Sequence, residues 1–453
     1  MPKPTLDDRI ARDIGLPSLT RAALAGHRLR ALNGTLARVV RESAFYAKHL
    51  RGVRLPLPSL EAIAALPFTT SADLIREPES FRCVPPGSVE RIVTLRSSGT
   101  TAQPKRIFFT RRDLDDTRAY FAAGLTTLLD PGEAVFILYA ASTPNSVGDL
   151  LAHAARDAGT RPVMPEPGEP FPSLVRRLER ERVRLLAGDP LQLLELARFN
   201  RFRGTGLRVP RVLLSADSVP DSLRRAVEQD LGAEVFAHYG SRETGYGGGL
   251  ECAAHRGCHM READLLIEAV EPETGVPLCA GETGELVVTV LRREGTPLIR
   301  YRTGDEGRRD SGPCPCGTVL ETWSGVRRIE RETLPAPLCC REALEDAAFA
   351  LPSVLDVRVR LWDDRIEIVL ETLSSSDYEP AVPEPLRDMI AAVRSIPVSL
   401  VVRGRSEPDL LPRRKRRIER IPGEPPPANP TLTDPTLAKS ALTEPAENDR
   451  EPA

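Results

Sequence analysis

Residues 134–140 read Ala-Val-Phe-Ile-Leu-Tyr-Ala, a compact apolar run that predicts a buried strand. Further strand patterns occur at 183–187, 209–214 and 235–237, and helical patterns at 174–182 and 221–231 alternate with them. Such alternation is typical of βαβ units, in which parallel strands lie side by side and helices cover the sheet. We therefore expect an α/β fold with a mainly parallel sheet.

The pattern changes on both sides of this region. An amphipathic helix is expected within residues 24–50, and residues 262–310 are rich in strand patterns, the clearest at 286–290. A smaller set of helix and strand patterns follows residue 323, and the chain beyond residue 422 is polar and rich in proline. These changes predict a large domain over 1–322 with a β-rich subdomain, a small α+β domain over 323–422, and a disordered tail over 423–453.

Composition limits the class of protein. The chain has 453 residues, 28% of them charged, and a net charge of -2, so it lacks the global charge that attracts proteins to nucleic acid or anionic membranes. No apolar run approaches the ~20 residues that span a bilayer, and the N-terminus lacks the pattern of a signal peptide. We expect a cytoplasmic protein with small-molecule partners, whose eight cysteines serve as metal ligands or buried thiols.

Residues 96–105 form the strongest local signal and read Arg-Ser-Ser-Gly-Thr-Thr-Ala-Gln-Pro-Lys. Small residues let backbone N–H groups approach phosphate oxygens, hydroxyl groups donate further hydrogen bonds, and the lysine adds positive charge. The spacing differs from that of the Walker loop. This stretch therefore indicates a phosphate-binding loop, with a surface turn rich in hydroxyl groups as the alternative.

Two later segments also combine an aromatic residue, a glycine and an acid. Residues 237–245 read Ala-His-Tyr-Gly-Ser-Arg-Glu-Thr-Gly, in which Tyr239 can stack on a base and Glu243 can hold Mg²⁺. Residues 297–305 read Pro-Leu-Ile-Arg-Tyr-Arg-Thr-Gly-Asp, and the carboxylate of Asp305 can accept two ribose hydroxyls. Each segment alone is also compatible with an ordinary turn.

In this order the three segments resemble the motifs of the adenylate-forming ligases (the acyl-CoA synthetase superfamily), and most of all those of the phenylacetate–CoA ligases and their relatives. The third segment matches the family's Tyr-Arg-Thr-Gly-Asp phrase fully, whereas the first carries Ala102 where the family has glycine. The resemblance extends over about residues 24–317. It implies ATP-dependent activation of a carboxylic acid, with an aryl acid favoured, to an acyl-AMP and then transfer to coenzyme A.

The resemblance also implies roles for single residues. The phosphates of ATP would contact Ser97, Ser98, Gly99, Thr100, Thr101 and Lys105. The adenosine would lie against Ala216, Asp217, Tyr239 and Gly240, with its ribose on Asp305, and Glu243 would bind Mg²⁺. Arg327 would supply the family's arginine, with Arg328 left open, and Lys415 would reach the carboxylate and the α-phosphate unless it belongs to a solvated basic run. The acid pocket is expected within residues 139–147.

Six cysteine and histidine residues flank the third segment. Two close groups of soft ligands separated by a strand-rich stretch are typical of a zinc site. Relatives that the chain resembles carry a Cys, a His seven residues later and a Cys-x-Cys-Gly phrase, which favours a structural zinc on Cys252, His259, Cys314 and Cys316. His255 and Cys258 stay open as alternative ligands, and buried thiols without metal are the other interpretation.

Two departures from the family leave other functions open. The family's hinge carries an Asp within a Gly-Arg-x-Asp-Asp phrase, whereas residues 323–330 read Trp-Ser-Gly-Val-Arg-Arg-Ile-Glu, and the late lysine lacks its usual glycine. One alternative is adenylyl or acyl transfer to an acceptor other than coenzyme A. A second alternative is a non-catalytic nucleotide-binding protein.

Overall fold

The computed structural model describes residues 5–95, 104–166, 168–330, 334–335, 338, 341–373, 384–393, 396–406, 416 and 418–421. These residues divide into two compact units, the first ending at Ile329 and the second beginning at Glu330. Residues 97–101 of the predicted phosphate loop and Lys415 lie outside the described residues, and so does the predicted tail.

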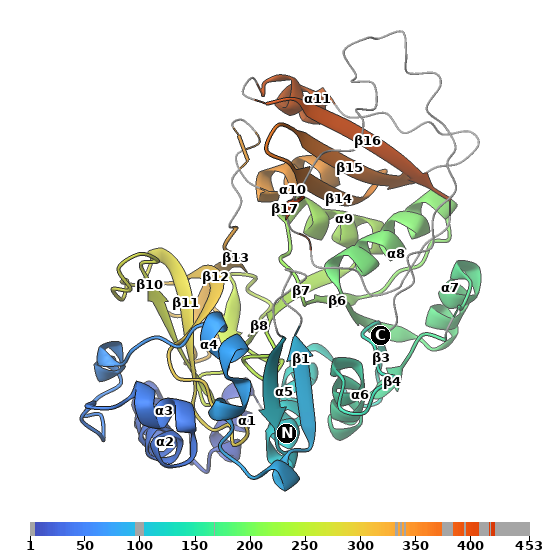
Figure 1. Ribbon diagram of the computed structural model, residues 1–453. Helices are drawn as coiled ribbons and strands as arrows, with labels where there is room; N and C mark the ends of the chain where they lie inside the picture. The colour runs from blue at the N-terminus through green and yellow to red at the C-terminus, as the bar shows by residue number, and fades with distance from the viewer. Residues whose placement is uncertain are drawn as a thin grey trace. The chain divides into compact units, whose positions relative to one another are not determined.

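The first unit is built on a mixed sheet of 11 strands, in the order β10-β11-β12-β13-β9-β8-β7-β6-β5-β3-β4 (Figure 1). One half is parallel and consists of β4 (Arg161–Val163), β3 (Ala134–Ile137), β5 (Val183–Gly188), β6 (Arg211–Leu214) and β7 (Glu234–Tyr239). The central strands are almost fully buried because helices cover them, which explains their continuous apolar sequence. The predicted α/β fold is confirmed.

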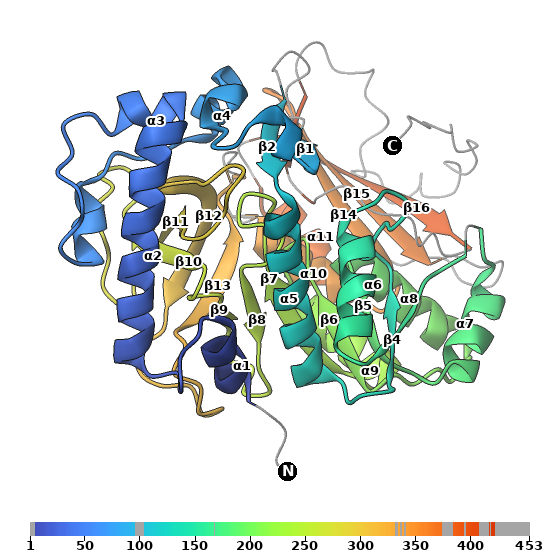
Figure 2. The ribbon, with the colours of Figure 1, turned by 90° about the horizontal axis from the view of Figure 1, so that it is seen from below.

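The helices of this half connect successive strands. They are α5 (Arg111–Leu128), α6 (Val147–Asp157), α7 (Phe171–Arg180), α8 (Pro190–Arg203) and α9 (Asp221–Leu231). Helix α5 begins at a capping box, in which the Thr110 and Asp113 side chains accept hydrogen bonds from each other's backbone N–H groups. Figure 2 shows α5 and α6 side by side over one face of the parallel strands, where Phe121 and Leu151 pack with Phe236 of β7.

The other half of the sheet is antiparallel. Its strands are β8 (Gly249–Glu251), β9 (Cys258–Met260), β10 (Leu265–Val270), β11 (Thr283–Val290), β12 (Tyr301–Arg309) and β13 (Thr322–Arg328). Because β13 pairs with β12 and β9, the first unit extends to Ile329 and does not end at the expected residue 322.

The N-terminal helices α1 (Leu6–Asp13), α2 (Arg21–Glu42) and α3 (Ala44–His49) adjoin this half (Figure 2). Leu32 and Leu36 of α2 pack against Leu286 and Val288 of β11 in one buried cluster. The single helix expected within 24–50 is in fact two helices, because Ser43 leaves the helical conformation and caps α3. Between α3 and the parallel half lie η1 (Glu61–Ala65), α4 (Ser71–Arg76), η2 (Pro78–Phe81), η3 (Pro86–Ser88) and the hairpin of β1 (Arg91–Leu95) and β2 (Lys105–Phe109).

The second unit is a small α+β fold, as expected. A four-stranded sheet has the order β16-β15-β14-β17, formed by β14 (Val354–Leu361), β15 (Ile366–Leu373), β16 (Val398–Arg405) and β17 (Ile418–Arg420). Its helices are α10 (Arg341–Phe349) and α11 (Glu384–Ala391). Across both units, none of the helices described has the length and apolar character required to cross a membrane.

Candidate nucleotide site and cysteine cluster

The second predicted motif lies at the carboxyl ends of neighbouring parallel strands, which is where ligands bind in open α/β sheets. Ala216 and Asp217 follow β6, and Tyr239 is the last residue of β7. Ala216 has a φ of 80°, a left-handed conformation that is uncommon for residues other than glycine. Gly240 is required for a steric reason, since a Cβ there would lie 2.4 Å from the carbonyl oxygen of Tyr246.

One residue from each of the three motifs takes part in a single cluster of polar contacts, formed by Lys105, Glu243 and Tyr301. The Nζ of Lys105 lies 2.7 Å from Oε1 of Glu243, and the Tyr301 hydroxyl lies 3.3 Å from both atoms. Burial by itself would raise the pKa of Glu243, but the charge of Lys105 and its hydrogen bond lower it overall. The site therefore holds an ionised carboxylate and an ammonium group in contact.

Asp305 joins the second and third motifs at a second point. The Tyr239 hydroxyl donates to its Oδ2 at 2.9 Å, and Nη1 of Arg328 lies 3.1 Å from its Oδ1. Burial and the neighbouring Asp305 both raise the pKa of Tyr239, so the phenol stays protonated. Burial disfavours the charge of Arg328, but Asp305 raises its pKa overall.

The structure distinguishes the two neighbouring arginines by their contacts. Asp305 pairs in register with Arg328, and Glu306 pairs with Arg327. Because successive side chains of a strand point to opposite faces, only one of the two arginines can face Asp305. Arg328 does so, whereas Nε of Arg327 binds Glu306 at 2.6 Å.

The conformation of the loop that carries Glu243 depends on Arg293 and Gly245. The buried Arg293 donates from Nη1 to the carbonyl oxygen of Glu243 at 2.6 Å, and its guanidinium lies 5.0 Å from the ring centre of Phe109. Burial lowers the pKa of Arg293 to about 10, so it remains charged near pH 7. Gly245 has a φ of 82°, and a Cβ there would lie 2.4 Å from Nη2 of Arg293. The loop thus depends on one buried cation and one glycine.

The predicted cysteine and histidine residues form a compact cluster. One ligand atom from each of Cys252, His259, Cys314 and Cys316 lies within 4.8 Å of the others. The Sγ atoms of Cys252 and Cys314 are 3.6 Å apart, and Sγ of Cys316 lies 3.3 Å from Nε2 of His259.

The two alternative ligands have other partners. Cys258 directs its sulfur to the carbonyl oxygen of Ala237 at 3.6 Å, and His255 pairs with Glu234 at 3.1 Å. The structure therefore brings together the favoured set of four and leaves His255 and Cys258 outside it.

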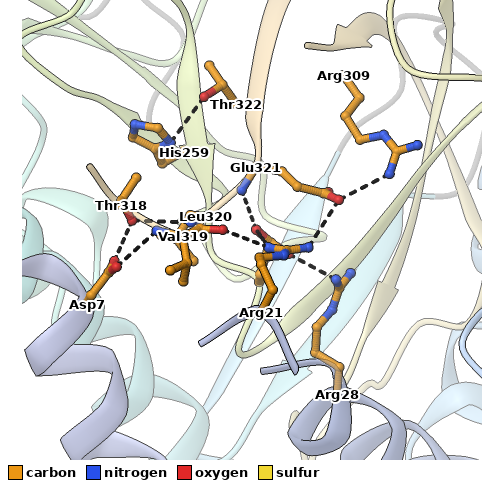
Figure 3. A network of polar contacts seen from close by, with 11 residues as sticks. Asp7, Arg21, Arg28, His259, Arg309, Thr318, Val319, Leu320, Glu321 and Thr322 are labelled. Atoms are coloured by element: carbon orange, nitrogen blue, oxygen red, sulfur yellow. Dashed lines mark hydrogen bonds and ion pairs between the residues drawn. The ribbon is translucent and has the colours of Figure 1, made fainter. Parts of the chain in front are cut away.

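The segment after Cys316 is fastened to the N-terminal helices, as Figure 3 shows. Asp7 of α1 accepts hydrogen bonds from the Thr318 hydroxyl and the Val319 N–H, and Arg21 of α2 donates to the Val319 carbonyl oxygen. The next contact is within the sheet, where Nδ1 of His259 lies 3.4 Å from the hydroxyl of Thr322. This contact leaves Nε2 of His259 to face the sulfur atoms.

The remaining polar contacts of this region are made to the carboxylate of Glu262. It accepts hydrogen bonds from Nη1 of Arg21, Nη1 of Arg28 and the backbone N–H of Glu321. Arg28 and Glu262 are both almost fully buried, with side chains 7% and 3% exposed. Helix α2 is thus connected to the end of the cysteine segment through a buried ion pair.

Comparisons with known proteins give consistent matches. The family described as AMP-binding enzyme matches residues 65–290. The phenylacetate-coenzyme A ligase of Thermus thermophilus is 31% identical over 316 residues, which cover 67% of this chain and 68% of that protein. That of Escherichia coli is 30% identical over 278 residues, or 59% of this chain and 62% of the relative.

Among solved structures, 2-hydroxyisobutyryl-CoA ligase in the postadenylation state, in complex with R3-HIB-AMP, aligns with a TM-score of 0.74. The alignment covers 88% of this chain and 90% of that one at 16% sequence identity. At this identity the match establishes a shared fold.

Proposed function

The chain belongs to the family of AMP-binding enzymes, and from this premise we propose that it activates a carboxylic acid with ATP and passes the acyl group to coenzyme A. The observation that supports this most directly is the contact of Lys105 with Glu243 and Tyr301, together with that of Tyr239 with Asp305. Three motifs that are far apart in sequence thereby contribute to one polar site.

Each group has a defined task in this proposal. A carboxylate oxygen of the acid attacks the α-phosphorus of ATP, pyrophosphate leaves, and the thiol sulfur of coenzyme A later displaces AMP from the acyl carbon. The acid needs no general base because it is already ionised near pH 7. Lys105 would offset phosphate charge and Asp305 would accept hydrogen bonds from the ribose, so positioning and electrostatics carry the catalysis.

Glu243 fits the role of a magnesium ligand. Mg²⁺ is commonly bound by one or two carboxylates together with substrate phosphates, and when bound it supplies positive charge against the phosphate oxygens. The pKa of Glu243 is lowered, so its carboxylate is ionised near pH 7. In this role Glu243 would also hold Lys105 in place through the contact at 2.7 Å.

The acid is proposed to be an arylacetic or related aryl acid, since the relatives are named phenylacetate-coenzyme A ligases. The test is exchange of labelled pyrophosphate into ATP across a panel of aryl and alkyl carboxylates, followed by CoA-dependent release of AMP. Lys105→Ala and Glu243→Ala should each lower exchange at least tenfold, which equals about 1.4 kcal/mol of transition-state stabilisation. Exchange that persists in both variants would contradict the assigned roles, and adenylate formation without a CoA-dependent product would contradict the thioester step.

We also propose that Cys252, His259, Cys314 and Cys316 hold a structural zinc ion. Tetrahedral zinc with sulfur at ~2.3 Å separates its ligand sulfurs by about 3.8 Å, close to the 3.6 Å between Cys252 and Cys314. Three thiolates and one imidazole complete the coordination and leave no position open for a substrate, which is the pattern of a structural site.

Metal analysis of purified protein tests this proposal. We expect about one zinc ion per chain, lost in Cys316→Ser and retained in Cys279→Ser, because Cys279 is an exposed cysteine outside the cluster. Chelation should lower the melting temperature of the wild-type chain and leave that of Cys316→Ser unchanged. Protein that purifies without zinc and is indifferent to chelators would contradict the assignment.

A further inference from the structure

Two neighbouring buried rings beside the nucleotide motifs each carry a polar atom without a hydrogen-bond partner in the described chain. These atoms are the hydroxyl oxygen of Tyr120, on α5, and Nε2 of His238, next to last in β7. The centres of the two rings are 6.0 Å apart. Because nearly all buried polar groups in proteins are hydrogen-bonded, two such atoms on neighbouring rings point to a partner from outside the chain.

His238 is held at its other ring nitrogen. Nδ1 lies 2.7 Å from the Ser215 hydroxyl, so this nitrogen has a partner. Burial lowers the pKa of His238 to about 4, so the ring is neutral near pH 7 and Nε2 is a donor in one tautomer and an acceptor in the other. In both tautomers Nε2 is without a partner among the described residues.

The pair also lies against the loop that carries Glu243. A Cβ at Gly247 would lie 2.3 Å from Cε1 of Tyr120, and a Cβ at Gly240 would lie 2.8 Å from Cε1 of His238. His238 directly precedes Tyr239, and side chains of consecutive strand residues point to opposite faces. Tyr239 reaches Asp305, so His238 occupies the other side of the same strand end, towards α5.

We propose that Tyr120 and His238 recognise a hydroxyl group on the acid, placed away from the reacting carboxylate. This inference rests on the proposed function and names the class of acid within it. A hydroxyl group both donates and accepts, so it can pair with the Tyr120 hydroxyl and with Nε2 of His238 in either tautomer. Sites built to bind a substrate hydroxyl discriminate strongly against analogues that lack it, because their own polar groups are then left unpaired.

The experiment measures acid-dependent pyrophosphate exchange with matched acids. Phenylacetate is compared with its 2-, 3- and 4-hydroxy derivatives and with the methyl derivatives at the same positions. Methyl and hydroxyl groups are similar in size, so this comparison separates hydrogen bonding from steric fit. We expect at least one hydroxy acid to exceed its methyl counterpart in kcat/KM at least tenfold.

Two variants test whether Tyr120 and His238 cause this preference, and a third variant is the control. Tyr120→Phe removes one oxygen, and His238→Asn keeps a polar atom near Nδ1 and removes Nε2. Each should lower kcat/KM for the preferred hydroxy acid at least fivefold and change that of phenylacetate less than twofold. Thr127→Val is the control, because it removes one hydroxyl from the exposed side of the same helix and should change neither value.

Equal rates for hydroxy and methyl acids in the wild type, or an equal loss for all acids in Tyr120→Phe, would overturn the inference while leaving the proposed function intact. Exchange with none of a broad panel of acids would count against the proposed function itself, and the inference would fall with its premise.

Discussion

Arg293 provides the sharpest test of how the site is held in shape. The change Arg293→Met removes the donor to the Glu243 carbonyl oxygen at 2.6 Å but keeps an unbranched apolar side chain in the buried space. A buried carbonyl left without its partner costs about 1–3 kcal/mol, and loss of the cation over Phe109 adds about 1 kcal/mol. If about half of this free energy is lost from transition-state stabilisation because Glu243 is displaced, pyrophosphate exchange falls about tenfold, since about 1.4 kcal/mol corresponds to a factor of ten.

The assay is pyrophosphate exchange at varied Mg²⁺–ATP and saturating acid, with the free energy of unfolding measured by urea titration in parallel. We expect Arg293→Met to raise the KM for Mg²⁺–ATP or lower the rate about tenfold, and Arg293→Lys to recover part of the loss because it restores the charge. Arg292→Met is the matched control. Its guanidinium pairs with Asp264 at 3.1 Å, not with the Glu243 loop, so we expect less than a twofold change. Wild-type behaviour of Arg293→Met, or an equal loss in Arg292→Met, would refute the reasoning.

Three further outcomes follow from the contacts. Arg328→Ala should weaken ATP binding at least fivefold in calorimetry, whereas Arg327→Ala should change it less than twofold, because only Arg328 contacts Asp305. Glu262→Gln should lower the unfolding free energy in urea by about 3 kcal/mol, because it leaves the buried Arg28 without its carboxylate. The folded state lowers the pKa of Glu243 from its ordinary value of 4.5, so this group stabilises the fold at pH values above 4.5. The stabilisation is lost as the pH falls through the lower pKa of the folded state. Glu243→Gln should therefore remove this acid-dependent loss of stability from the urea titrations.

The sequence predicted the parts of the site that local motifs carry. The resemblance placed Glu243 and Asp305 at one bound nucleotide, and the contacts of Glu243 with Lys105 and of Asp305 with Tyr239 bring the described parts of the motifs together. The favoured cysteine and histidine set was likewise brought together. In each case a short phrase fixes both the residue type and its place on the backbone.

The rest of the site depends on long-range packing, which leaves no local signature. The choice of Arg328 over Arg327 depends on the register of β13 against β12, and one residue of slip would reverse it. Arg293 follows β11 at a point where no motif marks it, and Tyr120 belongs to a helix whose sequence shows only an ordinary amphipathic pattern. Such residues become visible only when the atoms they leave unpaired, or the loop they support, can be seen in three dimensions.

The distance between the cysteine cluster and Asp305 decides between a catalytic and a structural role for a metal in the cluster. Thr322, at the start of β13, contacts His259 of the cluster, and Arg328, at its end, contacts Asp305. A strand rises ~3.3 Å per residue, so these two contacts lie roughly 20 Å apart along β13. A zinc ion in the cluster is therefore too remote to act on a reacting phosphate. Its influence on the nucleotide site would pass through the strands of the sheet, among them β13, which contacts the cluster at one end and carries Arg328 at the other.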